Sequence, residues 1–165
     1  MRVLKLGILA SVLGFTSVSY AAVIGGEIGG VFGANFNDAR SSFDADTEFS
    51  AGLYGRLWIK PSILRIAPFV KWESIGSLES NHRYNNFQYG GLLGVNFSIV
   101  TPYIGMAYSH FTNSALEPTW AVNYGIQIAL PAHITLGIDG SYQHPKFLGM
   151  KVEMHKIGAT LGIQF

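Results

Sequence analysis

One short segment contains the types of side chain that hydrolytic enzymes use. It reads Ser109-His110-Phe111-Thr112-Asn113-Ser114, and Glu117 follows soon after. A hydroxyl group beside a histidine, with a carboxylate to orient the ring, is the arrangement that activates a nucleophile for acyl transfer. The residue types therefore permit acyl-transfer chemistry, provided that the fold brings them together.

The same segment faintly resembles the His-x-Ser-Asn motif of outer-membrane lipid A deacylases, which are small β-barrels. It departs from that motif in two ways. The hydroxyl two positions after His110 belongs to Thr112 and not to a serine, and the segment lies far from the last two strands, where that family carries its motif. We therefore expect His110, Thr112 and Glu117 to belong to a polar surface loop, and we predict no catalytic residues. A lipid A-modifying enzyme remains one alternative.

Other candidates for chemistry are weaker. The five histidines are scattered, without the His-x-His or His-x-x-x-His spacing of metal ligands, and the chain has no cysteine. The glycine pairs at 25–26 and 29–30 lack the Gly-Lys-Ser/Thr that completes a phosphate-binding loop. The sequence therefore predicts no metal and no cofactor.

The composition is that of a chain with apolar surroundings. Charged residues make up 13% of the sequence, against about a quarter in typical soluble domains, whereas 48% of the residues are hydrophobic. The net charge is +1, and two of the eleven basic residues, Arg2 and Lys5, lie near the N-terminus. We expect no binding to nucleic acid, because no basic field would attract it.

Residues 1–21 have the pattern of a secretory signal peptide. Arg2 and Lys5 precede a mostly apolar run at 6–18, and Ser19-Tyr20-Ala21 places small residues where a signal peptidase needs them. The run is shorter than the ~20 residues of a membrane-spanning helix. We predict a signal peptide at 1–21, which directs export, and a single mature domain at 22–165.

The mature domain alternates between apolar and polar or small residues. Such a period of two is typical of strands whose two faces meet different surroundings. One face is apolar and aromatic from end to end, whereas a soluble barrel or sandwich would place polar residues on its outer face. The pattern predicts an all-β protein, an eight-stranded antiparallel transmembrane up-and-down β-barrel. Its expected strands are 23–36, 48–60, 64–74, 87–99, 103–109, 120–130, 134–143 and 155–165.

The connections between these strands alternate in length. Short turns are expected at 61–62, 100–102 and 131–132, and longer polar loops at 37–47, 75–84, 110–118 and 144–149. Transmembrane barrels have short periplasmic turns and longer extracellular loops. The alternation therefore predicts that the long loops face outward from the cell.

The polar face of the predicted strands carries as many acidic as basic residues. The interior of an eight-stranded barrel is only wide enough for side chains to fill it, and an unpaired charge there is costly. We therefore predict a paired network that plugs the lumen; the alternative is a small passive pore, in which one sign of charge usually dominates. The predicted network comprises Glu27, Glu48, Glu73 and Asp139 with Arg56, Arg65, Lys71 and Lys156, and Tyr54, Trp58, Phe69 and Tyr103 are expected to add bulk.

The last strand has the most specific feature of the sequence, because its apolar face continues to the final aromatic residue. That face comprises Ile157, Ala159, Leu161, Ile163 and Phe165. It resembles the closing strand of bacterial outer-membrane β-barrel proteins, whose assembly machinery recognises this end. The layout of residues 22–165 resembles the opacity-protein, OmpX-like and OmpA-barrel group.

The resemblance implies a protein of the bacterial outer membrane, surrounded by lipopolysaccharide and phospholipid. It implies that the barrel-assembly machinery recognises the strand that ends at Phe165. It further implies a monomer with a structural or surface-interaction role, whose loops meet an extracellular ligand or a host surface.

Overall fold

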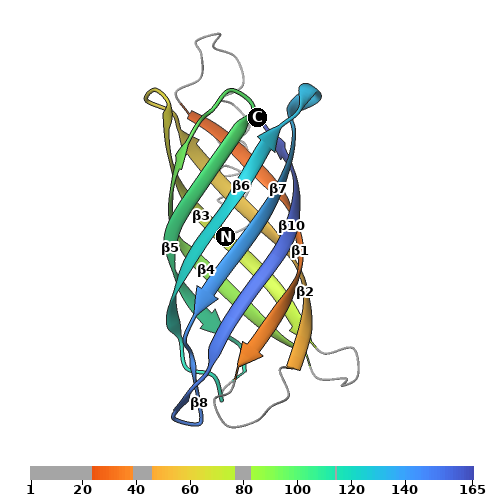
Figure 1. Cartoon of the computed structure of the whole chain (residues 1–165), viewed down its shortest axis with the longest axis vertical. Coiled ribbons are helices and arrows are strands. Elements are labelled where there is room, and N and C mark those ends of the chain that lie inside the picture. Colours follow the sequence, from red (N-terminus) through yellow and green to blue (C-terminus); the bar gives the residue numbers. More distant parts are fainter. Residues whose placement is uncertain (1–23, 39–45, 77–82, 114) are drawn as a thin grey trace, which may run out of the picture.

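The computed structural model describes residues 24–38, 46–76, 83–113 and 115–165, and it confirms the predicted fold class (Figure 1). Eight antiparallel strands form one closed barrel, in the order β1-β10-β7-β6-β5-β4-β3-β2. No helix among the described residues is long and apolar enough to span a membrane. The strands are β1 (Ile24–Asp38), β2 (Asp46–Ile59), β3 (Leu64–Gly76), β4 (Arg83–Val95), β5 (Val100–Phe111), β6 (Thr119–Ala129), β7 (Ile134–Gln143) and β10 (Glu153–Gln164).

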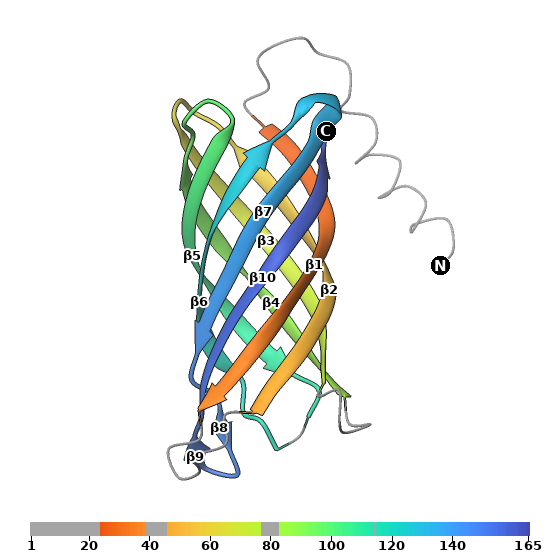
Figure 2. The ribbon, with the colours of Figure 1, turned by 45° about the vertical axis from the view of Figure 1, so that its right-hand side comes forward.

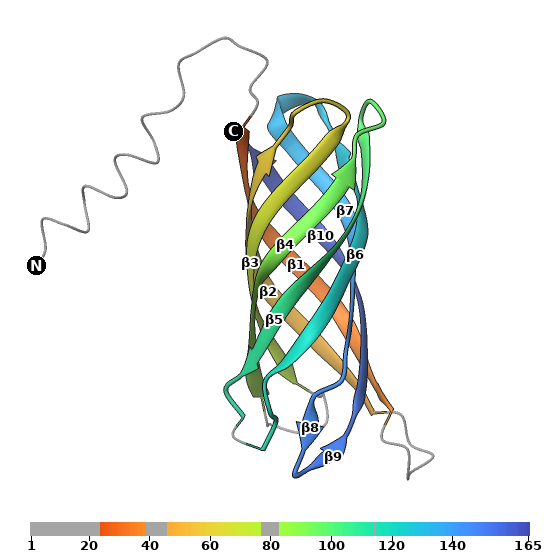
Figure 3. The same ribbon diagram turned by 90° about the vertical axis from the view of Figure 1, so that its left-hand side faces the viewer.

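The barrel closes where its first and last strands pair. β1 pairs with β10 over almost its whole length, and Gly26 and Phe165 exchange backbone hydrogen bonds of 2.8 and 2.9 Å. The β2–β3, β4–β5 and β6–β7 connections lie at this same end, the last with a short 3-10 turn, η1 (Pro131–His133). A small hairpin of β8 (Lys146–Phe147) and β9 (Met150–Lys151) projects at the opposite end (Figures 2 and 3).

The turn between β4 and β5 lies earlier than the sequence indicated. β4 ends at Val95 and the chain reverses at 96–99, whereas the predicted turn at 100–102 lies inside β5. Phe97 and Val100 exchange backbone hydrogen bonds, and Ser98 between them has a φ of 59°. Phe97 continues the apolar alternation of β4 into the turn, so periodicity could not locate the reversal.

Several strands also extend further than predicted toward the hairpin end. β3 continues to Gly76, β4 begins at Arg83, and β5 continues to Phe111. The predicted loop at 144–149 contains β8 and begins the hairpin. The strand ends at this level include polar residues on both faces, so the backbone ladder continues where the alternation has already stopped.

The outer face is apolar on every strand. Phe32 is 60% exposed, Leu53 62% and Ile138 61%. An aromatic line crosses three strands on this face, since the ring of Tyr108 lies 5.8 Å from that of Tyr89 and 5.6 Å from that of Trp120. The apolar surface therefore faces outward, and the polar and charged side chains that alternate with it along the strands point into the barrel.

Candidate functional site

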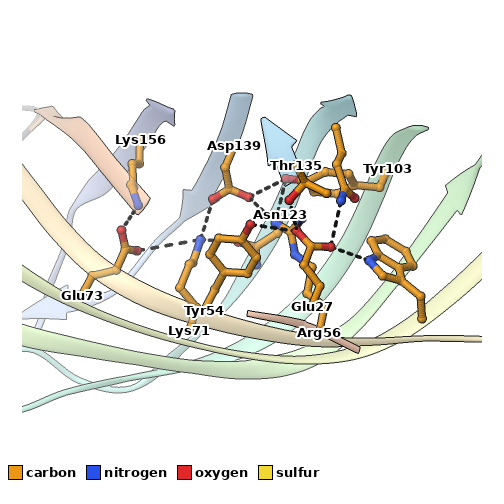
Figure 4. A network of polar contacts seen from close by, with 12 residues as sticks. Glu27, Tyr54, Arg56, Lys71, Glu73, Tyr103, Asn123, Thr135, Asp139 and Lys156 are labelled. Atoms are coloured by element: carbon orange, nitrogen blue, oxygen red, sulfur yellow. Dashed lines mark hydrogen bonds and ion pairs between the residues drawn. The ribbon is translucent and has the colours of Figure 1, made fainter. Parts of the chain in front are cut away.

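Six enclosed charges form a chain of alternating sign across the lumen (Figure 4). They belong to β1, β2, β3, β7 and β10, so strands on different sides of the barrel contribute to one chain. All six side chains are buried. In order along the chain they are Lys156, Glu73, Lys71, Asp139, Arg56 and Glu27.

Lys71 occupies the middle of this chain. Its Nζ lies 2.9 Å from Oδ2 of Asp139 and 3.8 Å from Oε2 of Glu73, and it donates a 3.0 Å hydrogen bond to Oδ1 of Asn123. Glu73 in turn contacts Lys156. A buried ammonium group is tolerated only when it is paired and hydrogen-bonded, and Lys71 meets both conditions.

Arg56 connects the middle of the chain to its other end. Its guanidinium group lies between two tyrosine rings, 4.4 Å from the centroid of Tyr54 and 4.6 Å from that of Tyr103. Nη2 donates to the hydroxyl of Tyr103 at 3.0 Å, and that hydroxyl donates to Asp139 at 2.8 Å. Cation–π contacts with the two rings stabilise the guanidinium group in this enclosed site.

Glu27 lies at the end of the charge chain and accepts several hydrogen bonds. Its carboxylate lies 3.8 Å from Nη1 of Arg56. It also accepts four hydrogen bonds, at 2.7, 2.7, 2.8 and 3.2 Å, from Tyr54, Trp58, Gln127 and Thr135 respectively. Sequence reasoning placed Thr135 on the inward face without assigning it to the network. It did not single out Gln127 or Asn123, although their position on the same face could have indicated them.

Two predicted members of the network, Glu48 and Arg65, do not join this chain. Glu48 is half-buried toward the hairpin end, where it accepts hydrogen bonds of 2.8 Å from Asn37 and Tyr84. Arg65 is half-buried near the opposite end, where it pairs in register with Gly94. All eight charges share the inward face, but these two lie at levels that the other six do not reach.

A cluster of bulky side chains lies beside the charge chain inside the barrel. It contains Trp58, Phe69 and Tyr103, which were expected from the sequence to add bulk to the lumen. Leu92 and two alanines complete it. The rings of Trp58 and Tyr103 meet edge to face at 6.4 Å. Sequence reasoning did not mention Leu92, although its place next to the outward-facing Leu93 puts it on the inward face.

The residues of the possible hydrolase segment are not assembled. Ser109 is fully buried in the lumen and donates a 2.7 Å hydrogen bond to Asn86, whereas His110 is exposed on the outer face of β5. The hydroxyl of Thr112 accepts a 2.9 Å hydrogen bond from the backbone N–H of Asn85, and the carboxylate of Glu117 lies 3.5 Å from Nζ of Lys146. The pleat of β5 therefore directs the serine and the adjacent histidine to opposite sides of the barrel wall.

His110 also corrects a prediction, since it lies in β5 and not in a loop. No group of three or more potential metal ligands was found among the described residues.

The five apolar residues of the last strand lie on the outer face. All are exposed there, and Phe165 remains 55% exposed. The ring of Phe165 covers Gly26 of β1, where a Cβ would overlap it. The C-terminal aromatic thus packs across the seam at which the barrel closes. The predicted signal peptide, residues 1–21, lies outside the described residues.

No protein-family model matches the sequence, and no curated protein matches it significantly. Solved structures resemble the fold at low sequence identity. Neisserial surface protein A has a TM-score of 0.59 at 16% identity, over 85% of this chain and 97% of that one. Ail, the attachment invasion locus protein of Yersinia pestis, has a TM-score of 0.56 at 13% identity, over 86% of this chain and 98% of that one. By its fold, the chain is a small transmembrane β-barrel of the eight-stranded type found among bacterial outer-membrane proteins.

Proposed function

We propose that this protein is an integral outer-membrane barrel with a lumen closed to ions, and that its hairpin end meets the surroundings of the cell. The observation that carries the proposal is the chain of six buried charges from Lys156 to Glu27. The proposed role is structural or in surface interaction.

The charge chain supports a closed lumen because each of its members already has a partner of opposite sign. A permeating ion would have to displace one of these partners in a confined space. Conduction needs sites that bind an ion weakly enough to release it, often lined by charges of one sign. A chain that is neutral overall and contacts bulky residues such as Trp58 and Tyr103 does not provide such a path.

The outer face supports a position in lipid. Large apolar side chains cover all strands, and the line from Tyr89 to Trp120 has the composition of an interfacial aromatic girdle. In the proposed setting, lipopolysaccharide and phospholipid surround the barrel, and the signal peptide at 1–21 directs export and is then removed. Phe165 would be recognised by the barrel-assembly machinery. Every barrel strand pairs on both sides, so no open edge requires a second copy, and we propose a monomer.

The hairpin end is the part that we propose meets an extracellular ligand or a host surface. Ail of Yersinia pestis has also been solved in complex with the heparin analogue sucrose octasulfate, with a TM-score of 0.57 at 13% identity, over 87% of this chain and all of that one. A barrel of similar size and fold thus carries a ligand in that case. The loop residues of this chain, and not those of Ail, would determine which kind of ligand it binds.

Conductance of the refolded protein in planar bilayers tests the closed lumen. We expect no stable current steps from the wild type. Replacing the inward pair Trp58→Ala and Phe69→Ala should produce steps, because it removes two bulky side chains from the lumen. The control replaces the adjacent outward pair, Leu57→Ala and Val70→Ala, and should remain silent. Stable steps from the wild type would instead favour the small passive pore.

A further inference from the structure

The hairpin of β8 and β9 is hydrogen-bonded to the connection between β5 and β6. Backbone hydrogen bonds run from the N–H of Glu117 to Lys146 at 2.9 Å and from the N–H of Leu148 to Ala115 at 3.2 Å. Leu116 and Phe147 form an additional antiparallel bridge. The hairpin and this connection therefore form one small, hydrogen-bonded platform beyond the barrel (Figure 3).

The tip of this platform exposes apolar side chains to solvent. Leu148 is 73% exposed, Met150 64% and Phe147 37%. Leu148 and Gly149 form the two-residue turn with φ values of 49° and 84°. Such turns favour Asn or Gly at the first position, and a bulky residue with positive φ is a genuine outlier. The chain thus holds a leucine outward in a conformation that disfavours it.

Two lysines flank these side chains. Lys146 precedes Phe147 and Lys151 follows Met150, and both lysines are exposed. Lys146 lies 3.5 Å from Glu117, farther down the platform. We name Phe147, Leu148 and Met150 with Lys146 and Lys151 the hairpin tip. Its outermost surface combines apolar side chains with positive charge, the composition of segments that bind membrane surfaces.

The size of the hairpin tip distinguishes between possible occupants. A stable protein interface buries about 800 Å² on each partner, contributed by some 20–30 residues. A two-residue turn with three apolar side chains presents far less than such a surface. Insertion of a few apolar side chains beneath lipid headgroups needs only a narrow tip, and nearby lysines attract anionic headgroups.

We infer that the hairpin tip is a membrane-contact device, which inserts Leu148 and Met150 into an opposing lipid surface that carries anionic headgroups, with Lys146 and Lys151 at its phosphates. The inference rests on the proposed orientation, in which the hairpin end faces away from the cell. The lipid surface would then be that of a neighbouring cell or vesicle, because the tip points away from the membrane that holds the barrel.

Vesicle flotation tests the inference with the full barrel held in nanodiscs of phosphatidylcholine. The probes are vesicles of phosphatidylcholine alone and vesicles of an equal mixture with phosphatidylglycerol. Leu148→Asn is the main variant, because Asn suits the turn and leaves the hairpin intact. Ile63→Asn is the matched control, because Ile63 is 62% exposed at the opposite end of the barrel.

We expect the wild type to float with the anionic vesicles and Leu148→Asn to bind them about tenfold more weakly or worse. Lys151→Gln should weaken binding about fivefold, and Ile63→Asn should leave it unchanged. The chain has no cysteine, so a polarity-sensitive dye on Leu148→Cys gives a second readout. Its emission should shift to the blue only with anionic vesicles.

Several results would overturn the inference. The first is that the wild type does not float with anionic vesicles, a result that would favour a protein ligand. The second is that the wild type floats equally well with neutral vesicles. The third is that Leu148→Asn floats as well as the wild type. The conductance measurement is independent of this test. A barrel that conducts ions but loses flotation in Leu148→Asn would refute the closed lumen and support the membrane-contact tip.

Discussion

Replacing Lys71 by methionine should destabilise the barrel strongly. Methionine keeps most of the length of the side chain and removes its charge. Lys71 holds Asp139 at 2.9 Å, Asn123 at 3.0 Å and Glu73 at 3.8 Å, all in the buried lumen. Removal of one partner from a buried ion pair typically costs about 3–5 kcal/mol. In the variant, Asp139 still has Arg56 as a cationic partner and Glu73 still has Lys156. We therefore expect a loss of stability at the lower end of this range, about 3 kcal/mol.

The assay is equilibrium unfolding by urea of the barrel in lipid vesicles, followed by tryptophan fluorescence and by the gel mobility of folded protein. Lys146→Met is the control, since this lysine is half-exposed in its pair with Glu117 and should contribute less than about 1 kcal/mol. The double variant Lys71→Met/Asp139→Asn should lose less unfolding free energy than the sum of the losses in the two single variants. The expected difference is about 0.5–3 kcal/mol. The reasoning would be refuted if Lys71→Met cost no more than Lys146→Met.

Three further predictions concern packing and assembly. Gly90→Ala should cost about 1–3 kcal/mol in urea unfolding, because its Cβ would overlap the carbonyl oxygen of Met106, whereas Gly91→Ala has open space and should be nearly neutral. Ile138→Arg on the outer face should lose about 2–4 kcal/mol in lipid by the same assay, and an arginine there that costs nothing would place this face in water. Deletion of Phe165 should lower the heat-modifiable folded fraction recovered from outer membranes, and an unchanged yield would show that the assembly machinery does not need this residue.

The positions of the strands could largely be predicted, but their ends could not. Period-two alternation identified β7 as 134–143, the bounds that the structure shows. It placed the turn after β4 too late, because Phe97 continues the apolar pattern outside the strand. It also treated His110 as a loop residue, although the β5 ladder extends to Phe111. Hydrophobic patterning reports the surroundings of a side chain, whereas the end of a strand depends on backbone pairing.

Alternation along each strand was enough to predict which side chains face inward. Successive side chains of a strand point to opposite faces, and an apolar surrounding on one side leaves one consistent assignment. Arg56, Lys71 and Asp139 could therefore be placed in the lumen together. The closed barrel was needed to show that they form one chain and that Thr135 donates to Glu27, 108 residues away. Such contacts depend on the register at which eight strands close, and alternation along one strand carries no information on that register.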